Sequence, residues 1–338
     1  MESIYWVVSR DCNQRCPHCY NNSAPGAVGL DLDQVTRCVE HLPDRGEVPL
    51  GRIILSGGEV LAWPQLLFHA LELLAARYAD DTGLWVQTNG DLLDEPMLDE
   101  LLRRGVQRID VSSMDQFHPK STLARRDYLL HLFHSRGIQP ADADQAGAGQ
   151  PTFAFWGATE EQWIGPLWPR GRARQHGLSA AAPEHDFCGN WSGAKHFLDY
   201  LDKSPAHGGS EVNIQLADLY PCCPMTCRPI GSLLNEPLLA MLDRCRQHPV
   251  FRALNEGRPE KMGEYMGPSE EFGRQHSREL GNHCLWCDEF FTKYGTDLLM
   301  HNATTERGTV DLDIRAGAPS RREVPADLAK LIAEKPLH

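Results

Sequence analysis

The chain is 338 residues long, carries a net charge of −13 and is 41% hydrophobic, which suits one large domain or two smaller ones with a sizeable core. The acidic balance argues against a nucleic-acid partner and suits a cationic small molecule, or simply a well-solvated surface. No apolar run approaches the roughly 18 residues of a membrane helix, and we find no export signal. Eleven cysteines in such a chain indicate metal or redox use in the cytoplasm.

The first predicted element is a strand over residues 4–8, an apolar run that ends shortly before a cysteine-rich loop. The loop carries Cys12, Cys16 and Cys19 in C-x3-C-x2-C spacing, with Tyr20 directly after the last cysteine. Three thiolates turned toward one point can hold a metal ion or an iron–sulfur cluster and leave one coordination position open. Zinc tolerates the same spacings, so these residues alone leave a zinc site as the alternative.

This motif, with its trailing aromatic residue, resembles the signature of the radical S-adenosylmethionine (radical SAM) superfamily. The resemblance implies a [4Fe–4S] cluster on the three cysteines, with its remaining iron chelated by the amino and carboxylate groups of SAM and with Tyr20 beside the cofactor. One electron from the cluster would cleave SAM to methionine and a 5′-deoxyadenosyl radical, which takes a hydrogen atom from the substrate. A flavodoxin, a ferredoxin or a reductase is then the implied electron donor.

The next segment predicts a helix over residues 32–42, capped by Asp31, with Cys38 as a core thiol. A strand over residues 52–55 follows and runs into Ser56, Gly57, Gly58 and Glu59. A Gly-Gly pair lets bare backbone approach a ligand, and the carboxylate can meet an ammonium group. The segment resembles the part of radical SAM domains that binds the amino group of SAM, although Val60 stands where the family usually has proline.

Further strands are predicted over residues 84–87, 106–112 and 152–156, helices over 63–77, 95–104 and 123–135, and a loop over 137–151. The strand over 84–87 runs into Thr88 and Asn89, as the third strand of the family often does. The next strand ends at Ser113, which the resemblance places near the SAM ribose. Beyond it, Asp115 and His118 face SAM or substrate, or His118 is an ordinary loop histidine.

Late in this region Gly171-Arg172-Ala173 resembles an element found near SAM in many radical SAM domains, which makes Arg172 a candidate cofactor contact. Strands alternating with helices predict an α/β fold with a parallel sheet. With the resemblance, we expect a partial, open (β/α) barrel with its active site at the carboxyl ends of the strands. The predicted domains are a radical SAM barrel over residues 1–185, an auxiliary-cluster domain over 186–300 and a tail over 301–338.

A second cysteine set begins at Cys188 and continues past a short predicted helix over 196–202 and a hairpin over 211–221. The hairpin ends at Cys222, a helix is predicted over 236–248 with Cys245 in its core face, and a C-x2-C pair follows at Cys284 and Cys287. The pattern resembles the SPASM/twitch extension of radical SAM enzymes, and this implies an auxiliary [4Fe–4S] cluster on Cys188, Cys222, Cys284 and Cys287. Cys223 could replace Cys222, and zinc suits the same spacing.

Two thiols beside this set, Cys223 and Cys227, remain as an inert pair, extra ligands or hydrogen-atom donors. The architecture resembles radical SAM enzymes that tailor aminoglycosides and aminocyclitols. We therefore expect hydrogen abstraction from a small, cationic sugar and epimerisation with a cysteine thiol as donor. The alternatives are dehydrogenation with the auxiliary cluster as electron acceptor, modification of a peptide, and a zinc-binding scaffold without catalytic activity.

Overall fold

The computed structural model describes residues 1–300 except 79–80, 113, 119, 142–148, 158–166, 180–184, 191, 203–209 and 227. Two predicted site residues, Ser113 and Cys227, therefore lie outside the described residues, as does the predicted tail over 301–338.

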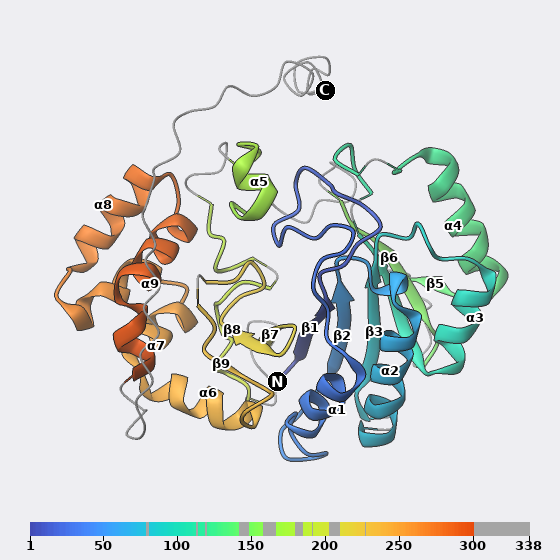
Figure 1. Cartoon of the computed structure of the whole chain (residues 1–338), viewed down its shortest axis with the longest axis horizontal. Coiled ribbons are helices and arrows are strands. Elements are labelled where there is room, and N and C mark those ends of the chain that lie inside the picture. Colours follow the sequence, from blue (N-terminus) through green and yellow to red (C-terminus); the bar gives the residue numbers. More distant parts are fainter. Residues whose placement is uncertain are drawn as a thin grey trace.

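One nine-stranded sheet organises the molecule, in the order β5-β6-β4-β3-β2-β1-β7-β8-β9 (Figure 1). The strands are β1 (Ser3–Ser9), β2 (Arg52–Gly57), β3 (Gly83–Thr88), β4 (Val106–Val111), β5 (Gln139–Pro140), β6 (Thr152–Phe155), β7 (Glu211–Gln215), β8 (Asp218–Tyr220) and β9 (Gly231–Ser232). Every pairing from β5 across to β7 is parallel, and β8 and β9 add antiparallel pairs. The sheet is open, and the expected partial barrel is confirmed.

The interior position of β1 explains its composition. All seven of its residues are buried, as in a parallel strand covered on both faces. Ile4, Trp6 and Val8 pack into the main core, whereas Tyr5 and Val7 lie in a small separate cluster with Cys223 and Ile54 on the other face. The alternation of side chains along one strand thus gives β1 a structural face and a face toward the candidate site.

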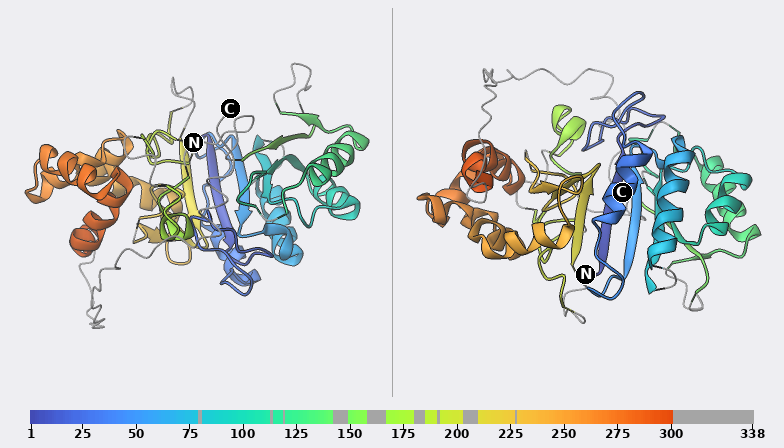
Figure 2. Two further views of the ribbon diagram at one scale, coloured as in Figure 1. Left: turned by 90° about the horizontal axis from the view of Figure 1, so that it is seen from above. Right: turned by 60° about the horizontal axis from the view of Figure 1, so that its bottom comes forward.

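The helices gather in two groups on either side of the strands (Figures 1 and 2). The first group is α1 (Leu32–Glu40), α2 (Pro64–Tyr78), α3 (Glu95–Arg103) and α4 (Leu123–Ser135), and the second is α6 (Leu238–Gln247), α7 (Pro249–Asn255), α8 (Glu270–Leu280) and α9 (His283–Met300). Between them lies the short α5 (Gly171–Gln175). The 3-10 helices are η1 (Val60–Ala62) and η3 (Pro259–Met266). Across the described ranges, no helix is both long enough and apolar enough to traverse a bilayer.

Local sequence patterns account for most of these elements. Asp31 caps α1 and forms a reciprocal capping box with Gln34, as expected from the residues before the helix. Cys38 and Cys245 are buried core thiols, which confirms their predicted role. The helix predicted over 196–202 is wrong, because the described residues there form a series of turns.

Two long-range features were not expected. The predicted loop over 137–151 contains β5, a two-residue edge strand paired with β6. The predicted hairpin is present, but β7 also pairs in parallel with β1. Strands from both sides of the predicted domain boundary at residues 185–186 therefore belong to one sheet. The domain division at that point stays a prediction.

Candidate active site

A cavity of about 160 Å³ opens at the carboxyl ends of the central parallel strands. Cys12, Cys16 and Cys19 line it from the loop after β1. The end of β2 contributes Ser56, Gly57 and Gly58, and the residues after β3 and β4 contribute Asn89 and Ser112. The structure therefore brings the cysteine loop together with the strand ends that the sequence analysis singled out.

Two of the three loop cysteines, Cys12 and Cys16, are weakly acidic in the protein alone. Burial raises the pKa of Cys12 to about 11, and burial together with the neighbouring Cys12 and Cys19 thiolates raises the pKa of Cys16 to about 12. Over the residues that the structure describes, no three His, Cys, Asp or Glu side chains converge closely enough to hold a single metal ion. Three thiols from one loop around one cavity nevertheless fit a thiolate-bound cluster with an open position.

The glycine pair at the end of β2, Gly57 and Gly58, is required by the cysteine loop. A Cβ atom on Gly58 would lie 2.3 Å from the carbonyl oxygen of Asp11, and one on Gly57 would lie 2.8 Å from that of Ser9. The Gly58 N–H donates to the Ser9 carbonyl at 2.7 Å. We expected bare backbone here for a ligand, and the structure shows that the cysteine loop itself approaches this backbone.

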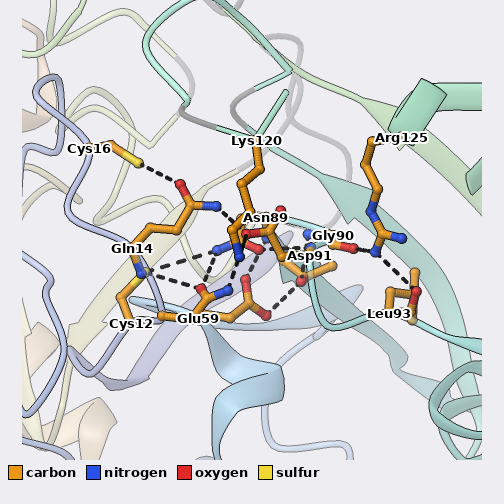
Figure 3. Close-up of polar contacts among 12 residues, drawn as sticks. Cys12, Gln14, Cys16, Glu59, Asn89, Gly90, Asp91, Leu93, Lys120 and Arg125 are labelled. Atoms are coloured by element: carbon orange, nitrogen blue, oxygen red, sulfur yellow. Dashed lines mark hydrogen bonds and ion pairs between the residues drawn. The ribbon is translucent and has the colours of Figure 1, made fainter. Parts of the chain in front are cut away.

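Glu59 stands behind the cavity rather than in its wall. The residue is 1% exposed, and its carboxylate accepts hydrogen bonds from Thr88 Oγ1 and the Asn89 N–H, both at 2.6 Å, beside the cysteine loop (Figure 3). It also accepts from the Leu61 N–H at 3.0 Å. Burial raises its pKa to about 7 despite these donors. Glu59 and Thr88, two predicted cofactor contacts, therefore join the ends of β2 and β3 and do not line the cavity.

Asn89 carries this network to the cysteine loop. Its side-chain amide donates to Asn13 Oδ1 at 2.8 Å, and Asn13 in turn donates to Asp91 Oδ2 at 3.1 Å (Figure 3). Gln14 also donates to Asp91, and it lines the cavity next to the cysteines. Sequence reasoning missed Asn13 and Gln14, although their place between the first two cysteines of the motif could have drawn attention to them.

Arg172 holds the other side of the cysteine loop. Its guanidinium donates to the carbonyl oxygens of Cys16 at 2.7 Å and Ser23 at 2.6 Å, and its backbone N–H donates to the Cys19 carbonyl at 2.9 Å. Gly171, with φ of +50°, fits against Tyr20, because an added Cβ would lie 2.3 Å from the Tyr20 carbonyl oxygen. Arg172 lines the cavity as well, so it both positions the loop and faces the candidate site.

Cys223 lies in the wall of this same cavity. Its side chain is 2% exposed, and its Sγ hydrogen-bonds the Tyr20 hydroxyl at 2.7 Å. Burial raises the pKa of this thiol well above its ordinary value. Nearby, the Tyr5 hydroxyl donates to Gln87 Oε1 at 2.6 Å and lies 2.8 Å from Ser56 Oγ. A protonated thiol and a polar network thus meet on the face of the sheet opposite the main core.

His118 contributes a second reactive side chain to the cavity. It is 4% exposed, and neither ring nitrogen has a hydrogen-bond partner among the described residues. Burial lowers the pKa of His118, so the ring is neutral near pH 7 and offers one donor and one acceptor. Asp115 is buried outside the wall of the cavity, where its carboxylate accepts from the Phe117 N–H at 2.9 Å.

The second cysteine set surrounds a separate, smaller cavity. Its lining includes Cys188, Cys222, Cys284 and Cys287. Burial raises the pKa of Cys222 to about 12 and that of Cys284 to about 11. Consecutive residues thus divide between two cavities, since Cys222 lines this one and Cys223 lines the other.

Sequence reasoning missed Arg170, which is 8% exposed and lines the second cavity. It lies two positions before Arg172, outside the Gly-Arg-Ala element, and no sequence motif marks it. The Arg170 guanidinium pairs with the Asp288 carboxylate at 3.2 Å. The neighbouring Glu289 pairs with His276 at 2.9 Å.

The cysteine loop and the strand ends behind it belong to a recognisable family region. The family model of the Radical SAM superfamily matches residues 6–127. Those residues are a radical SAM domain. The domain accounts for the first cavity's cysteines and for the Gly-Gly-Glu and Thr-Asn-Gly segments, and radical SAM proteins as a family imply SAM and a [4Fe–4S] cluster.

Two relatives are AdoMet-dependent heme synthases. The one from Methanosarcina barkeri is 36% identical over 113 residues, which cover 32% of this chain and 30% of that protein. The one from Nitratidesulfovibrio vulgaris is 32% identical over 113 residues, which cover 32% of this chain and 28% of that protein. The chain therefore spans less than a third of the length of these relatives.

A solved structure is similar to this chain in fold. A crystal structure of BtrN in complex with AdoMet and 2-DOIA is similar with a TM-score of 0.50 and 17% sequence identity, covering 76% of this chain and 88% of that chain. At this level of identity the likeness concerns the fold alone.

Proposed function

We propose that this protein is a radical SAM enzyme that epimerises a small, polar, cationic substrate, with Cys223 as the hydrogen-atom donor. The observation that carries the proposal is the position of Cys223, whose buried thiol lines the same cavity as Cys12, Cys16 and Cys19. The net charge of −13 supports a cationic aminoglycoside or aminocyclitol as substrate.

The residues present fit the cofactors of this chemistry. Cys12, Cys16 and Cys19 would hold a [4Fe–4S] cluster, and Gly58, Asn89 and Arg172 border the space that SAM would occupy. When bound and reduced, the cluster and SAM supply a 5′-deoxyadenosyl radical that removes a hydrogen atom from a substrate C–H bond. Because the raised pKa values keep the Cys12 and Cys16 thiols protonated without metal, loading the cluster requires loss of their protons.

The contribution of Cys223 is to return a hydrogen atom. The substrate carbon radical takes the hydrogen from Sγ, so an S–H bond breaks, a C–H bond forms, and a thiyl radical remains. Delivery to the face opposite the original hydrogen inverts the carbon. One electron from a flavodoxin- or ferredoxin-type donor and one proton from solvent restore the thiol. Tyr20, at 2.7 Å from Sγ, holds the thiol toward the cavity.

The test is anaerobic turnover of an aminoglycoside panel with SAM and reductant in deuterium oxide, read by mass spectrometry. The wild type is expected to form 5′-deoxyadenosine and to add one deuterium at carbon, because the thiol proton exchanges with solvent. Cys223→Ala is expected to form 5′-deoxyadenosine without the epimer. Cys38→Ala is the matched control, since Cys38 is an equally buried thiol in α1.

Full epimer formation by Cys223→Ala would exclude Cys223 as donor. Cys227 would then be tested by the same substitution, because it was the other predicted donor. SAM cleavage with every sugar unchanged would exclude this substrate class, and peptides would be tried next.

A second candidate function is dehydrogenation, which His118 favours. Oxidation of an alcohol through a carbon radical needs a base for the hydroxyl proton. His118 lies in the cavity wall, and its neutral ring has no hydrogen-bond partner among the described residues. The second electron would go to an auxiliary cluster on Cys188, Cys222, Cys284 and Cys287, whose shared cavity supports this ligand set. In the experiment above, loss of two hydrogens with no deuterium gain would favour this function over epimerisation.

The relatives support AdoMet chemistry more than any substrate. The match covers less than a third of each heme synthase, so it does not support a heme-related substrate for this chain. BtrN was crystallised with AdoMet, and its likeness in fold agrees with SAM as the proposed cofactor here.

A further inference from the structure

Two arginines in one short segment bind the two cysteine sites. Arg172 donates to the backbone of the first loop at Cys16 and Ser23. Arg170 extends to the second site, where its guanidinium donates to the Cys284 carbonyl at 2.8 Å and to the Met225 carbonyl at 3.2 Å. The segment is therefore hydrogen-bonded to backbone carbonyls beside both cysteine sets.

Arg170 is also a buried charge among sulfur atoms. It is 8% exposed and lines the second cavity together with its four cysteines. Its one carboxylate contact within the described residues is Asp288, at 3.2 Å. Arg174 pairs with the same carboxylate at 3.4 Å, but its side chain is 56% exposed, so solvent screens its charge. A buried cation in such a place is stable only when negative charge surrounds it, and four thiolates would supply that charge.

We propose that Arg170 is a positioning residue of the four-cysteine site and that its charge raises the reduction potential of the cluster held there. The inference rests on the auxiliary cluster of the proposed function. A reduced thiolate-ligated cluster carries one more negative charge than the oxidised one, so a nearby buried cation stabilises the reduced form more. Asp288 acts in the opposite direction, because it offsets part of the arginine charge.

The experiment is a redox titration of the reconstituted full-length protein, followed by electron paramagnetic resonance. It is done in a Cys12→Ala/Cys16→Ala/Cys19→Ala background, so that only the second cluster contributes to the spectrum. Arg170→Gln is expected to lower the midpoint potential, and Asp288→Asn is expected to raise it. Arg174→Gln is the matched control and should leave the potential near the wild-type value, since it removes an exposed arginine from the same carboxylate.

An unchanged potential in a fully loaded Arg170→Gln protein would overturn the inference, and so would a potential that does not rise in Asp288→Asn. If Arg170→Gln fails to bind iron, two other variants test the inference. Arg170→Lys is expected to keep a near-native midpoint potential, and Asp288→Asn is expected to raise it. Metal analysis of the wild type comes first. One cluster only, or zinc in place of iron, would exclude the auxiliary cluster itself before any variant is compared.

Discussion

Cys222 and Cys223 are neighbours in sequence whose side chains line different cavities. Sequence reasoning left open which of them belongs to the second cysteine set, because the spacing of cysteines in a motif does not show where each side chain points. The structure places Cys222 beside the other three cysteines of the second set and Cys223 in the wall of the first cavity. The decisive information is three-dimensional, since Tyr20 from the other end of the chain fixes the Cys223 side chain.

The contact between Tyr20 and Cys223 carries a prediction of its own. Tyr20→Phe keeps the ring and removes the hydroxyl that lies 2.7 Å from Sγ. Loss of one hydrogen bond, about 1 kcal/mol, should reduce epimer formed per 5′-deoxyadenosine by roughly 5- to 10-fold. The ratio of the two products, measured by mass spectrometry, reads this effect.

A control for this variant is Tyr78→Phe, whose hydroxyl donates to the Pro43 carbonyl at 2.8 Å away from the candidate site. An equal fall of the ratio in both variants, or none in Tyr20→Phe, would mean that the hydroxyl does not orient the thiol.

At the scale of elements, the turn after β2 and the loop after β1 form one unit. Their backbones are too close for any side chain at Gly58, where a Cβ would lie 2.3 Å from the Asp11 carbonyl oxygen. Gly58→Ala should therefore displace the cysteine loop and reduce the iron bound at the first site by half or more, at a cost of roughly 1–3 kcal/mol in stability. Iron analysis after anaerobic reconstitution measures the loss.

Gly26→Ala, in the loop after β1, is the control. Its Cα has open space around it, so the substitution adds only the strain of a positive φ of +78°, about 1 kcal/mol. Native iron content in Gly58→Ala would show that the loop can move without losing the site.

The elements that sequence predicted well are those with local causes. The α1 cap and the alternation of strands and helices up to β6 follow from residues close together in the chain. The pairing of β7 with β1 has no local cause, because it depends on a sheet edge formed some two hundred residues earlier. The buried role of Glu59 was also out of reach, since a Gly-Gly-Glu segment does not show where its carboxylate points.

At the scale of the whole molecule, the second cysteine set connects distant parts of the chain. The four cysteines line one cavity but are far apart in sequence: Cys188 and Cys222 come from separate loops, and Cys284 and Cys287 from α9. Removal of metal by a chelator should therefore loosen the second helical group and leave β2, β3 and α2 intact. Hydrogen exchange is expected to rise in α8 and α9 by at least tenfold, because a metal that binds the folded state stabilises what its ligands connect. Equal protection with and without metal would contradict a structural role of the site.

The position of β1 has a consequence for how the protein is made. Ser3 pairs with Glu211, 208 positions further along the chain, so one edge of β1 has no partner until that residue leaves the ribosome. At about 5–20 residues per second, this edge waits for roughly 10–40 s. Throughout that time an apolar strand with unpaired backbone groups can recruit strands from other chains. Soluble yield should therefore depend on how well the cell shields this edge, more than on the final stability of the fold.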